Sequence, residues 1–338
     1  MLMPLIYLVG GFILLIKGAD WLVEGASSIA RRFGLSDLMI GLTVVSFGTS
    51  APELIVNIIA SFQGSADIAI GNIVGSNISN TMLILGITAL ITPLAVQRST
   101  VLKEIPFMLL ASITLLIMAN DMLVDGYAQS ELSRSDGLAF LGFFIIFMYY
   151  TFGLNGSTTL EDGHTKPKMP LGKAWLLFSI GLLGLGVGGN LAVEGAKAIA
   201  AIFGLSEALI GLTVVALGTS LPELTASIVA ARKGKTDIAI GNIVGSNIFN
   251  IFWILGISAA IKPLPFKPAL NVDLLVVVGC TALLFFLIHN GGLHHRVLLW
   301  WKQERDYILN KFEGGVLLAG YVAYISYIVY RDLFLVVN

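Results

Sequence analysis

Long apolar segments separated by short polar connections dominate this chain. A membrane-spanning helix needs roughly 17–25 mostly apolar residues, and ten segments reach that length. Membrane strands are a poor fit, because the apolar runs are too long and do not alternate with polar residues. We therefore expect ten membrane helices, over 4–29, 36–61, 67–92, 101–119, 137–153, 171–201, 206–231, 237–261, 271–289 and 314–331.

The composition agrees with a multi-pass membrane protein. The 338 residues are 56% hydrophobic and 12% charged, with a mean hydropathy of +0.88, whereas soluble domains run to about 25% charged residues. Cys280 is the single cysteine, so helix packing must hold the fold without an intramolecular disulfide. The N-terminus lacks a basic region before its apolar segment, which predicts a retained first span. We expect a monomer in the cell membrane whose partners are the lipid bilayer and transported cations, with no nucleic acid.

An internal repeat organises the sequence. Residues 41–87 and 211–257 align without a gap, with 31 identities in 47 pairs. A polar connection with glycines and prolines separates five predicted spans from five. Repetition at this scale indicates two copies of one structural unit. The sequence thus predicts a first five-helix repeat over 1–153, a cytoplasmic linker over 154–170 and a second five-helix repeat over 171–338.

Five spans in each half mean that the second half starts on the opposite side of the membrane. The predicted fold is therefore an all-α integral membrane protein of ten transmembrane helices, arranged as two inverted five-helix repeats. That architecture is typical of secondary transporters, which bind substrate near the midplane between the repeats. Placing both termini outside puts fourteen Lys and Arg residues in inside loops and five in outside loops. The positive-inside rule thus predicts extracellular N- and C-termini.

Each repeat carries the same polar motif within an apolar span. The motif reads Gly-Thr-Ser-Ala-Pro-Glu at 48–53 and Gly-Thr-Ser-Leu-Pro-Glu at 218–223. Pro52 and Pro222 cannot donate a backbone hydrogen bond, so a break is expected at each, and such breaks survive in a bilayer where they line a cavity. A carboxylate at membrane depth is costly and suggests a functional site. Helical spacing places one polar stripe on a single face of each span: Ser46, Thr49, Ser50, Glu53 and Asn57, and again Ala216, Thr219, Ser220, Glu223 and Ser227.

The third and eighth spans supply further neutral oxygen donors. These stack at intervals of four residues, as Asn72, Ser76 and Asn80, and as Asn242, Ser246 and Asn250. No His or Cys occurs at these positions, which argues against zinc, copper or iron and leaves hard cations. Ca²⁺ takes about 6–8 oxygen ligands in irregular geometry, whereas Mg²⁺ demands stricter geometry and ranks lower. Two carboxylates match the charge of one divalent ion, and without it they would repel each other. Na⁺ and H⁺ are natural competitors for the same oxygens.

The doubled motif, followed in each half by Gly-Asn-Ile-Val-Gly-Ser-Asn-Ile-x-Asn, closely resembles the paired alpha repeats of the sodium/calcium exchangers. These belong to the cation/calcium exchanger superfamily, and the resemblance, to a compact prokaryotic type, covers nearly the whole chain. It implies a ten-helix fold with four cation sites in a diamond, and alternating access by sliding of the first and sixth helices. By motif position it implies central calcium ligands Glu53 and Glu223 helped by Thr49 and Thr219, sodium sites that add Ser50, Ser220, Ser76, Ser246 and the backbone carbonyls of Ser46 and Ala216, and Asn80 at the centre.

One position departs from the family pattern. Many family members carry aspartate where this chain has Asn250, which leaves the stoichiometry and the counter-ion open. The expected function is a non-enzymatic antiporter that exchanges Ca²⁺ for Na⁺, with electrogenic Ca²⁺ export. Ca²⁺/H⁺ or K⁺-assisted exchange and a passive cation channel remain as alternatives. An intramembrane hydrolase has little support, because the chain has no His-Glu-x-x-His motif and no nucleophile–histidine pair next to Glu53.

Two acidic residues outside the motif have a structural explanation. Asp67 and Asp237 each stand where a predicted helix begins, so we expect them to act as N-caps. Glu24 and Glu194 recur near the far ends of the first and sixth spans. Both an anchor at the membrane interface and the edge of an ion pathway remain open for that pair.

Overall fold

The computed structural model describes residues 2–153, 169–202, 218–290 and 307–334. Within these ranges, eight helices are long and apolar enough to cross a membrane, and a ninth span is formed by a helix pair bent by 48°. The predicted seventh span, 206–231, begins outside the described residues, and its described part is one helix, Leu221–Arg232. The predicted linker also lies outside them, apart from its last two residues.

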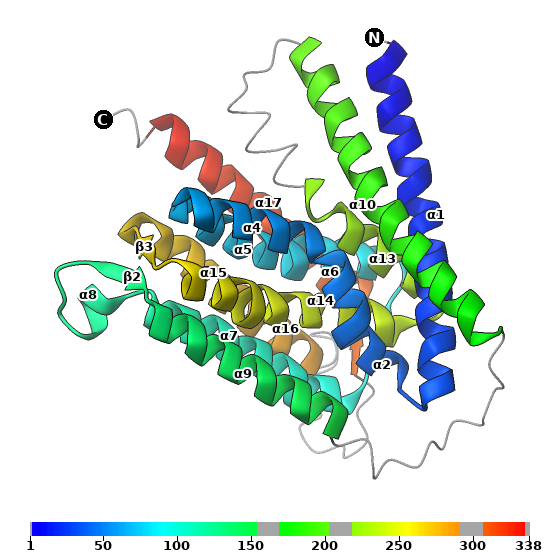
Figure 1. The fold of residues 1–338 in the computed structure, drawn as a ribbon, viewed down its shortest axis with the longest axis horizontal. Coiled ribbons are helices and arrows are strands. Elements are labelled where there is room, and N and C mark those ends of the chain that lie inside the picture. Colours follow the sequence, from blue (N-terminus) through cyan, green and yellow to red (C-terminus); the bar gives the residue numbers. More distant parts are fainter. Residues whose placement is uncertain (1, 154–168, 203–217, 291–306, 335–338) are drawn as a thin grey trace.

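The first half contains five spans whose ends agree with the predicted segments within a few residues (Figure 1). The second span is broken, and the second, third and fourth spans each include a π-helical stretch (η), where the helix is locally wider. Its elements are α1 (Leu2–Phe33); α2 (Asp37–Ile40), η1 (Gly41–Val45), α3 (Ser46–Thr49) and α4 (Ala51–Gln63); α5 (Ala66–Ile78), η2 (Ser79–Ile84) and α6 (Leu85–Ile91); β1 (Leu94–Val96); η3 (Thr100–Glu104) and α7 (Ile105–Met118); α8 (Asp121–Val124); β2 (Ser130–Leu132); and α9 (Arg134–Gly153).

The second half repeats this order. Its third span again passes from α-helix through a π-helical stretch at the same place in the repeat. The elements are α10 (Leu171–Ile202); α13 (Leu221–Arg232); α14 (Thr236–Ile248), η6 (Phe249–Leu255) and α15 (Gly256–Ile261); β3 (Leu264–Phe266); the 3₁₀ turn η7 (Pro268–Leu270); α16 (Asn271–Asn290); β4 (Tyr307–Leu309); and α17 (Lys311–Phe334).

Four short strands, which the apolar pattern does not predict, tie each half to the other. β1 of the first half pairs antiparallel with β4 of the second, and β2 of the first half pairs antiparallel with β3 of the second. β1 and β3 occupy equivalent places, each directly after the third span of its half. The two small sheets therefore follow the same inverted relation as the helices.

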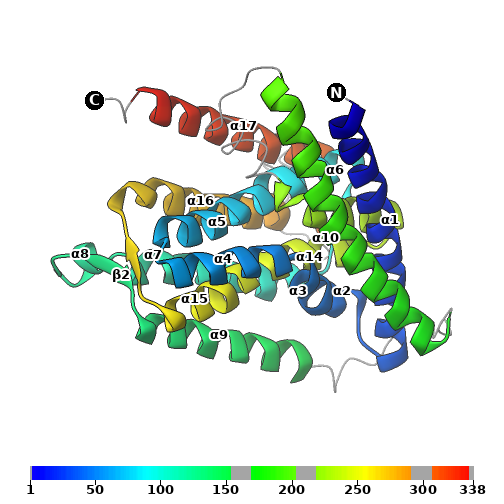
Figure 2. The same ribbon diagram turned by 45° about the horizontal axis from the view of Figure 1, so that its top comes forward.

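The first helix of each half packs against its counterpart. α1 and α10 lie side by side and cross the remaining helices obliquely (Figures 1 and 2). They run antiparallel: a Cβ built at Gly11 would lie 2.5 Å from Ala192 N, and one at Gly181 would lie 2.5 Å from Leu22 N. Such close approach of two helix backbones requires residues without a side chain at the contact, a recurrent feature of membrane helix pairs. The antiparallel pairing of equivalent helices is the inversion that five spans per half predict.

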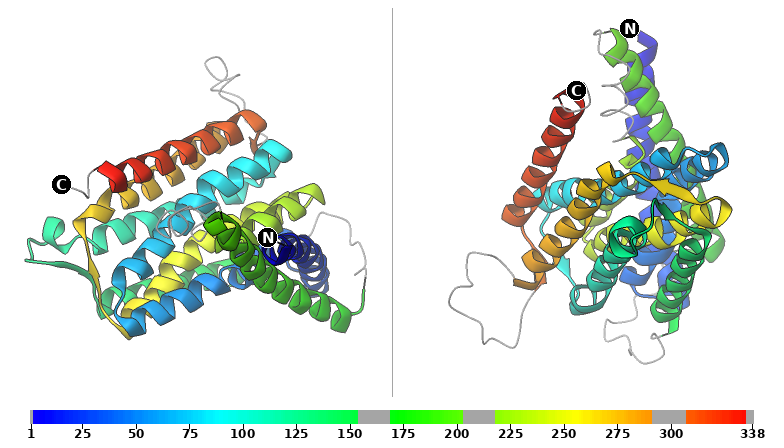
Figure 3. Two further views of the ribbon diagram at one scale, coloured as in Figure 1. Left: turned by 90° about the horizontal axis from the view of Figure 1, so that it is seen from above. Right: turned by 90° about the vertical axis from the view of Figure 1, so that its left-hand side faces the viewer.

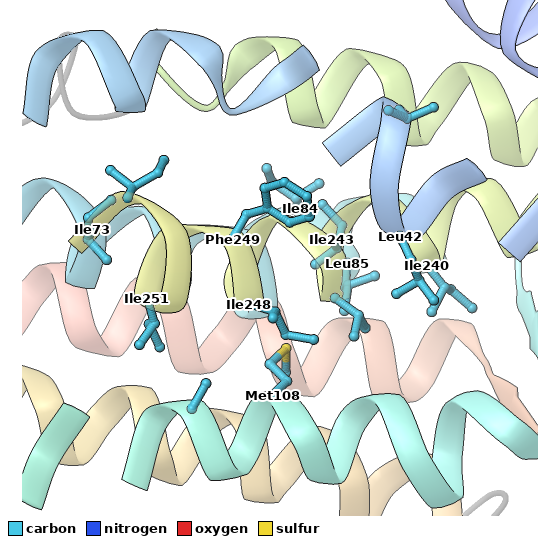
Figure 4. Packing of buried hydrophobic residues seen from close by; sticks show 14 of the residues in the cluster. Leu42, Ile73, Ile84, Leu85, Met108, Ile240, Ile243, Ile248, Phe249 and Ile251 are labelled. Carbon is cyan, nitrogen blue, oxygen red and sulfur yellow. The ribbon is translucent and has the colours of Figure 1, made fainter. Parts of the chain in front are cut away.

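α14 and its continuation form the centre of the molecule. In its most apolar 18-residue window, 94% of the residues of the Thr236–Ile261 span are buried, against 22% for α1. A helix covered on all sides needs no polar face, which explains the largely apolar and small sequence of α14. Figure 4 shows Ile248 of α14 pointing towards Met108 of α7, with Ile243 further along the same helix. Figure 3 shows α9 and α17 on opposite flanks of this central layer.

The N-cap prediction for Asp67 and Asp237 is wrong. Both lie in the first turn of their helices rather than at the cap. Asp67 instead accepts a hydrogen bond from Lys267, and Asp237 accepts one from Gln97 at 2.7 Å. Lys267 and Gln97 are equivalent in the two repeats, so each aspartate is held by the loop of the other half. Helix-start patterns miss these contacts because the partners lie at least 140 residues away.

Candidate functional site

The two motifs form matching breaks in the backbone. Ser50 stands between α3 and α4 with φ −83° and ψ 7°, and Ser220 precedes α13 with φ −88° and ψ 1°. Pro52 and Pro222 follow in the first turn of the next helix, where a missing N–H costs no hydrogen bond. The prolines therefore begin the second helical segment instead of kinking a continuous one. Each glutamate comes immediately afterwards, in that same first turn.

The carboxylates of Glu53 and Glu223 are both fully buried and lie between the two repeats. Ser50 Oγ donates a hydrogen bond across the repeat interface to Glu223 Oε1 at 3.2 Å. Ser76 Oγ donates to Glu53 Oε1 at 3.3 Å, and the Thr219 hydroxyl lies within reach of the same carboxylate. Each glutamate thus has the motif of the opposite repeat beside it, as expected for two breaks that face each other.

The third and eighth spans line the same interior. Thr49 Oγ1 donates to Asn242 Oδ1 at 3.0 Å, which joins the broken second span to α14. The Asn242 amide group in turn donates to Ser227 Oγ at 3.1 Å and to the backbone carbonyl of Glu223 at 3.4 Å. Asn242 therefore holds the segments that carry both motifs in fixed relation.

A symmetric set of asparagines crosses the interface next to the glutamates. Asn80 Nδ2 donates to Asn247 Oδ1 at 3.1 Å, and Asn250 Nδ2 donates to Asn77 Oδ1 at 2.9 Å. Asn247 Nδ2 donates to Thr81 Oγ1 at 2.8 Å. The amide nitrogens of Asn80 and Asn250 are thus occupied, whereas the side-chain oxygen of each is buried without a hydrogen-bond partner.

The unpartnered oxygens fit a cation rather than a proton donor. A buried polar atom is normally hydrogen-bonded, and an exception calls for an explanation. Six such oxygens belong to residues predicted for the site, and both repeats contribute to them. All six residues are buried from solvent. Oxygens of this kind are the ligands of hard cations. The set comprises Glu53 Oε2, Glu223 Oε2, Asn80 Oδ1, Asn250 Oδ1, Ser220 Oγ and Ser246 Oγ.

The sequence predicts the backbone carbonyls of Ser46 and Ala216 as ligands, and the structure describes only the first of them. The Ser46 carbonyl accepts the Ser50 N–H at 2.9 Å and a contact from Thr49 Oγ1 at 3.4 Å, so it is engaged within the helix end in this conformation. The Ser46 hydroxyl lies 2.7 Å from Gly41 O and 2.9 Å from Asn242 O and shares its one hydrogen between these acceptors, which packs the second span against α14. Ala216 lies outside the described residues.

Among the described residues, the face of α5 beside the site has no close neighbour at its glycines, whereas the equivalent face of α14 is covered. A Cβ built at Gly245 would lie 2.5 Å from Leu42 O, so the second span sits directly on α14. The equivalent Gly75, like Gly71 on α5, has nothing within 4 Å of such a Cβ and lines a cavity of about 300 Å³ that reaches Ser76 and Thr219.

A second cavity of about 500 Å³ reaches the same region between α4, α10 and α13. It is lined by Thr219 and Pro222 at the site and by Glu194 and Lys197 on α10, which form an ion pair of 2.9 Å. Glu194 thus stands at the wall of this cavity. Two cavities, one beside α5 and one beside α10, thus reach Thr219.

Asn77 and Asn247 are the members of this site that sequence reasoning did not single out. They fall off the i, i+4, i+8 stripe that identified Asn80 and Asn250, because they use the neighbouring helix face to contact the other repeat. Their presence at the same place in both copies of the repeated motif was the available signal.

Replacing Asn247 by alanine is expected to weaken the binding of Na⁺, which depends on neutral oxygen donors such as Asn80. The change removes the acceptor that orients the Asn80 amide, so its oxygen is no longer fixed. We expect the Na⁺ concentration for half-maximal exchange to rise by about fivefold, the size of one lost hydrogen bond of roughly 1 kcal/mol. This concentration is measured from the initial rates of ⁴⁵Ca²⁺ uptake into proteoliposomes loaded with increasing concentrations of Na⁺. Thr88→Val, which removes a buried hydroxyl bonded along its own span to Ile84 O, should leave the value unchanged.

The fold and the site together define a class: a membrane transporter built of inverted repeats with an oxygen-only cation site between them. The family model described as "Sodium/calcium exchanger protein" matches residues 3–153 and 173–330. The chain belongs to the sodium/calcium exchanger protein family, as the doubled motif predicted.

Individual relatives agree. The inner membrane protein YrbG of Escherichia coli (strain K12) is 41% identical over 274 residues, which cover 78% of this chain and 81% of that protein. The sodium/calcium exchanger MaX1 of Methanosarcina acetivorans is 32% identical, covering 95% and 97%. A solved structure of the sodium-calcium exchanger NCX_Mj superimposes with a TM-score of 0.79 at 33% identity, covering 97% and 99%. The predicted all-α membrane fold of ten helices in inverted repeats is thereby confirmed.

Proposed function

We propose that this protein exchanges Ca²⁺ for Na⁺ across the membrane by alternating access, with both ions bound between the repeats. The observation that carries the proposal is the meeting of Glu53 and Glu223, each fully buried and each contacted by the opposite motif. Their two charges balance one Ca²⁺ or two Na⁺. Family membership and the likeness to NCX_Mj support this choice of ions.

The ligand assignment combines the positions that the family motif implies with the unpartnered oxygens of the site. Glu53 and Glu223 would bind Ca²⁺ centrally, helped by the hydroxyls of Thr49 and Thr219. Na⁺ would use the same carboxylates together with neutral donors on both sides. These are Ser50, Ser220, Ser76, Ser246, Asn80 and Asn250, with the Ser46 carbonyl after release from its helical contact and with Ala216. Because Na⁺ and Ca²⁺ share oxygens, binding of one excludes the other, which is the basis of exchange.

α10 is placed to couple ion binding to access. Leu182 and Val193 of α10 seat over Gly48 and Gly218, where an added Cβ would come within 2.3 Å and 2.1 Å of their methyl groups. The helix that is paired with α1 therefore rests on both motif breaks at once. A change at either break on ion binding would shift the α1–α10 pair and alter which cavity is open. The proposed division into repeats over 1–153 and 171–338, joined by a cytoplasmic linker at 154–170, suits this movement.

Orientation and direction complete the proposal. With both termini extracellular, α5 and α16 begin at the outer face, so the cavity beside α5 that reaches Ser76 and Thr219 would open outward. An inward Na⁺ gradient would then drive Ca²⁺ export. Exchange of more than two Na⁺ for each Ca²⁺ would be electrogenic. Monomeric function is consistent with a site composed wholly of residues from one chain.

Reconstitution with imposed gradients tests the counter-ion. We expect ⁴⁵Ca²⁺ uptake into Na⁺-loaded proteoliposomes to exceed uptake into K⁺-loaded ones by at least about tenfold, because both gradients supply charge but the site selects by ion size and ligand number. Uptake driven by a pH gradient alone, or stimulated by K⁺ added to Na⁺, would assign the protein to Ca²⁺/H⁺ or K⁺-assisted exchange instead. Uptake without any internal cation would indicate a channel.

A further inference from the structure

The cavity that opens beside α5 extends past the predicted ligands to a second carboxylate. Ser76 and Thr219 line its wall at the site, and Asp273, Tyr324 and Arg331 line the same cavity on α16 and α17. Ser79 also lines it, and its hydroxyl oxygen is buried without a hydrogen-bond partner. One cavity, whose lining also includes apolar side chains such as Val74 and Leu270, thus joins the wall of the site at Ser76 and Thr219 to Asp273. Asp273 is a residue that the repeat motif does not include.

The carboxylate of Asp273 is buried, and protein side chains rather than water contact it. Asp273 is 3% exposed and stands in the first turn of α16. Tyr324 Oη donates to its Oδ1 at 3.1 Å, and Arg331 Nη1 donates to its Oδ2 at 3.1 Å and to its Oδ1 at 3.4 Å. The Arg331 side chain is 23% exposed and also lies over the Tyr327 ring, 5.7 Å from the centroid. The carboxylate is therefore fixed by the tyrosine, while the arginine at the last turn of α17 has a second partner.

Resting on the proposed exchange function, we propose that Asp273 is an additional cation-binding position on this access path. An arriving hydrated Ca²⁺ or Na⁺ pairs with the Asp273 carboxylate before moving on to Glu53 and Glu223, and Arg331 is the charge that it displaces. A fixed arginine in the wall of a cation path would otherwise repel ions at short range. The Tyr327 ring offers the displaced guanidinium a favourable cation–π position.

The first repeat provides a matched comparison. Its carboxylate next to the equivalent position is Glu104, which likewise accepts a tyrosine hydroxyl, from Tyr150 Oη at 3.1 Å. In the second half, however, Phe249 stands at the position equivalent to Ser79. The ring of Phe144 packs on Phe249 with ring centroids 4.8 Å apart. Glu104 therefore shares the chemistry of Asp273 without lining the cavity beside α5.

The test measures Ca²⁺ affinity separately on the two faces of the membrane. Exchange by the wild-type protein is first established in proteoliposomes of defined orientation. With Asp273→Asn, we expect the Ca²⁺ concentration for half-maximal exchange to rise by about fivefold on the face where α16 begins, since one unit charge is removed along the path, and to stay unchanged on the other face. Arg331→Gln should lower it on the same face. Glu104→Gln should leave the value on that face unchanged.

Two further arms keep the outcome decisive. Asp273→Asn removes the carboxylate with which Arg331 forms its ion pair. The double variant Asp273→Asn/Arg331→Gln removes both charges, so it lacks the carboxylate without adding a net positive charge, and it should show the same one-sided loss. Wild-type affinity on both faces in the double variant, or an equal change on both, would overturn the assignment. If the wild-type protein does not exchange ions, the proposed function fails. In that case, calorimetric titration with Ca²⁺ is carried out on the variant Glu53→Gln/Glu223→Gln, with and without the further change Asp273→Asn. Ca²⁺ binding that remains in the first variant and is lost with Asp273→Asn supports the proposed position. The absence of any remaining Ca²⁺ binding in the first variant overturns it.

Discussion

Replacing either Glu53 or Glu223 by glutamine is expected to abolish Na⁺-dependent Ca²⁺ exchange. Glutamine keeps the size and one oxygen of the side chain but removes half of the negative charge available at the site. The remaining carboxylate cannot compensate a divalent ion that has left its hydration shell. Loss of one partner from a buried charge pair costs about 3–5 kcal/mol, and every 1.4 kcal/mol corresponds to roughly tenfold in affinity. We therefore expect a decrease of at least about 100-fold in ⁴⁵Ca²⁺ uptake at fixed ion concentrations.

Glu104→Gln is the control for this result. Glu104 is also a buried carboxylate in a membrane span, 5% exposed, and its Oε2 has no hydrogen-bond partner. It contacts Tyr150 rather than either motif. Exchange should persist in this variant. Wild-type exchange rates in both Glu53→Gln and Glu223→Gln would show that the cations bind elsewhere and would remove the basis of the proposed function.

Adding one methyl group at each of two positions between α1 and α10 should destabilise the protein. A Cβ at Gly11 would lie 2.7 Å from Gly188 O, and one at Gly181 would lie 2.7 Å from Gly18 O. These contacts are with backbone atoms, so a rotamer change cannot relieve them and the two helices must separate. Overpacking of this kind costs about 1–3 kcal/mol for each position. We expect Gly11→Ala/Gly181→Ala to unfold at a temperature roughly 5–10 °C lower, as measured by size-exclusion recovery after heating in detergent.

Two other glycines on the same helices serve as the control, because alanine there should not lower the melting temperature. Gly10 and Gly186 have nothing within 4 Å of an added Cβ. Alanine is favoured over glycine inside a helix by about 1 kcal/mol, so Gly10→Ala/Gly186→Ala should be neutral or slightly stabilising. Equal melting temperatures for the two double variants would mean that α1 and α10 are not held together by the close backbone approach.

Much of the architecture could be predicted because the membrane restricts the choice. Apolar length located the spans, and the repeat in 41–87 and 211–257 fixed their inversion. The prediction of a proline break was right in place but incomplete in form, because Pro52 opens α4 instead of bending a continuous helix. The π-helical stretches at Ser79–Ile84 and Phe249–Leu255 have no proline or glycine pattern that would reveal them.

Contacts between distant residues account for what the sequence could not predict. The residues of the site were found by their spacing along one helix, and spacing carries no information about which atom of the other repeat each one meets. The Asn77–Asn250 and Asn80–Asn247 pairs are 173 and 167 residues apart in the chain. Asp273 could not be predicted from the repeat for a related reason: the equivalent residue in the first half is Lys103, so the carboxylate has no counterpart there.

The cross-pairing of β1 with β4 and of β2 with β3 bears on how the chain is made. Neither small sheet can form until the last of its strands has been synthesised, and the Asn77 amide group likewise waits for its acceptor, the Asn247 carbonyl. During biosynthesis the earlier half must remain in the bilayer with polar side chains still uncovered. Completion of the later half then closes both ends of the molecule, so the two halves mature as one cooperative unit.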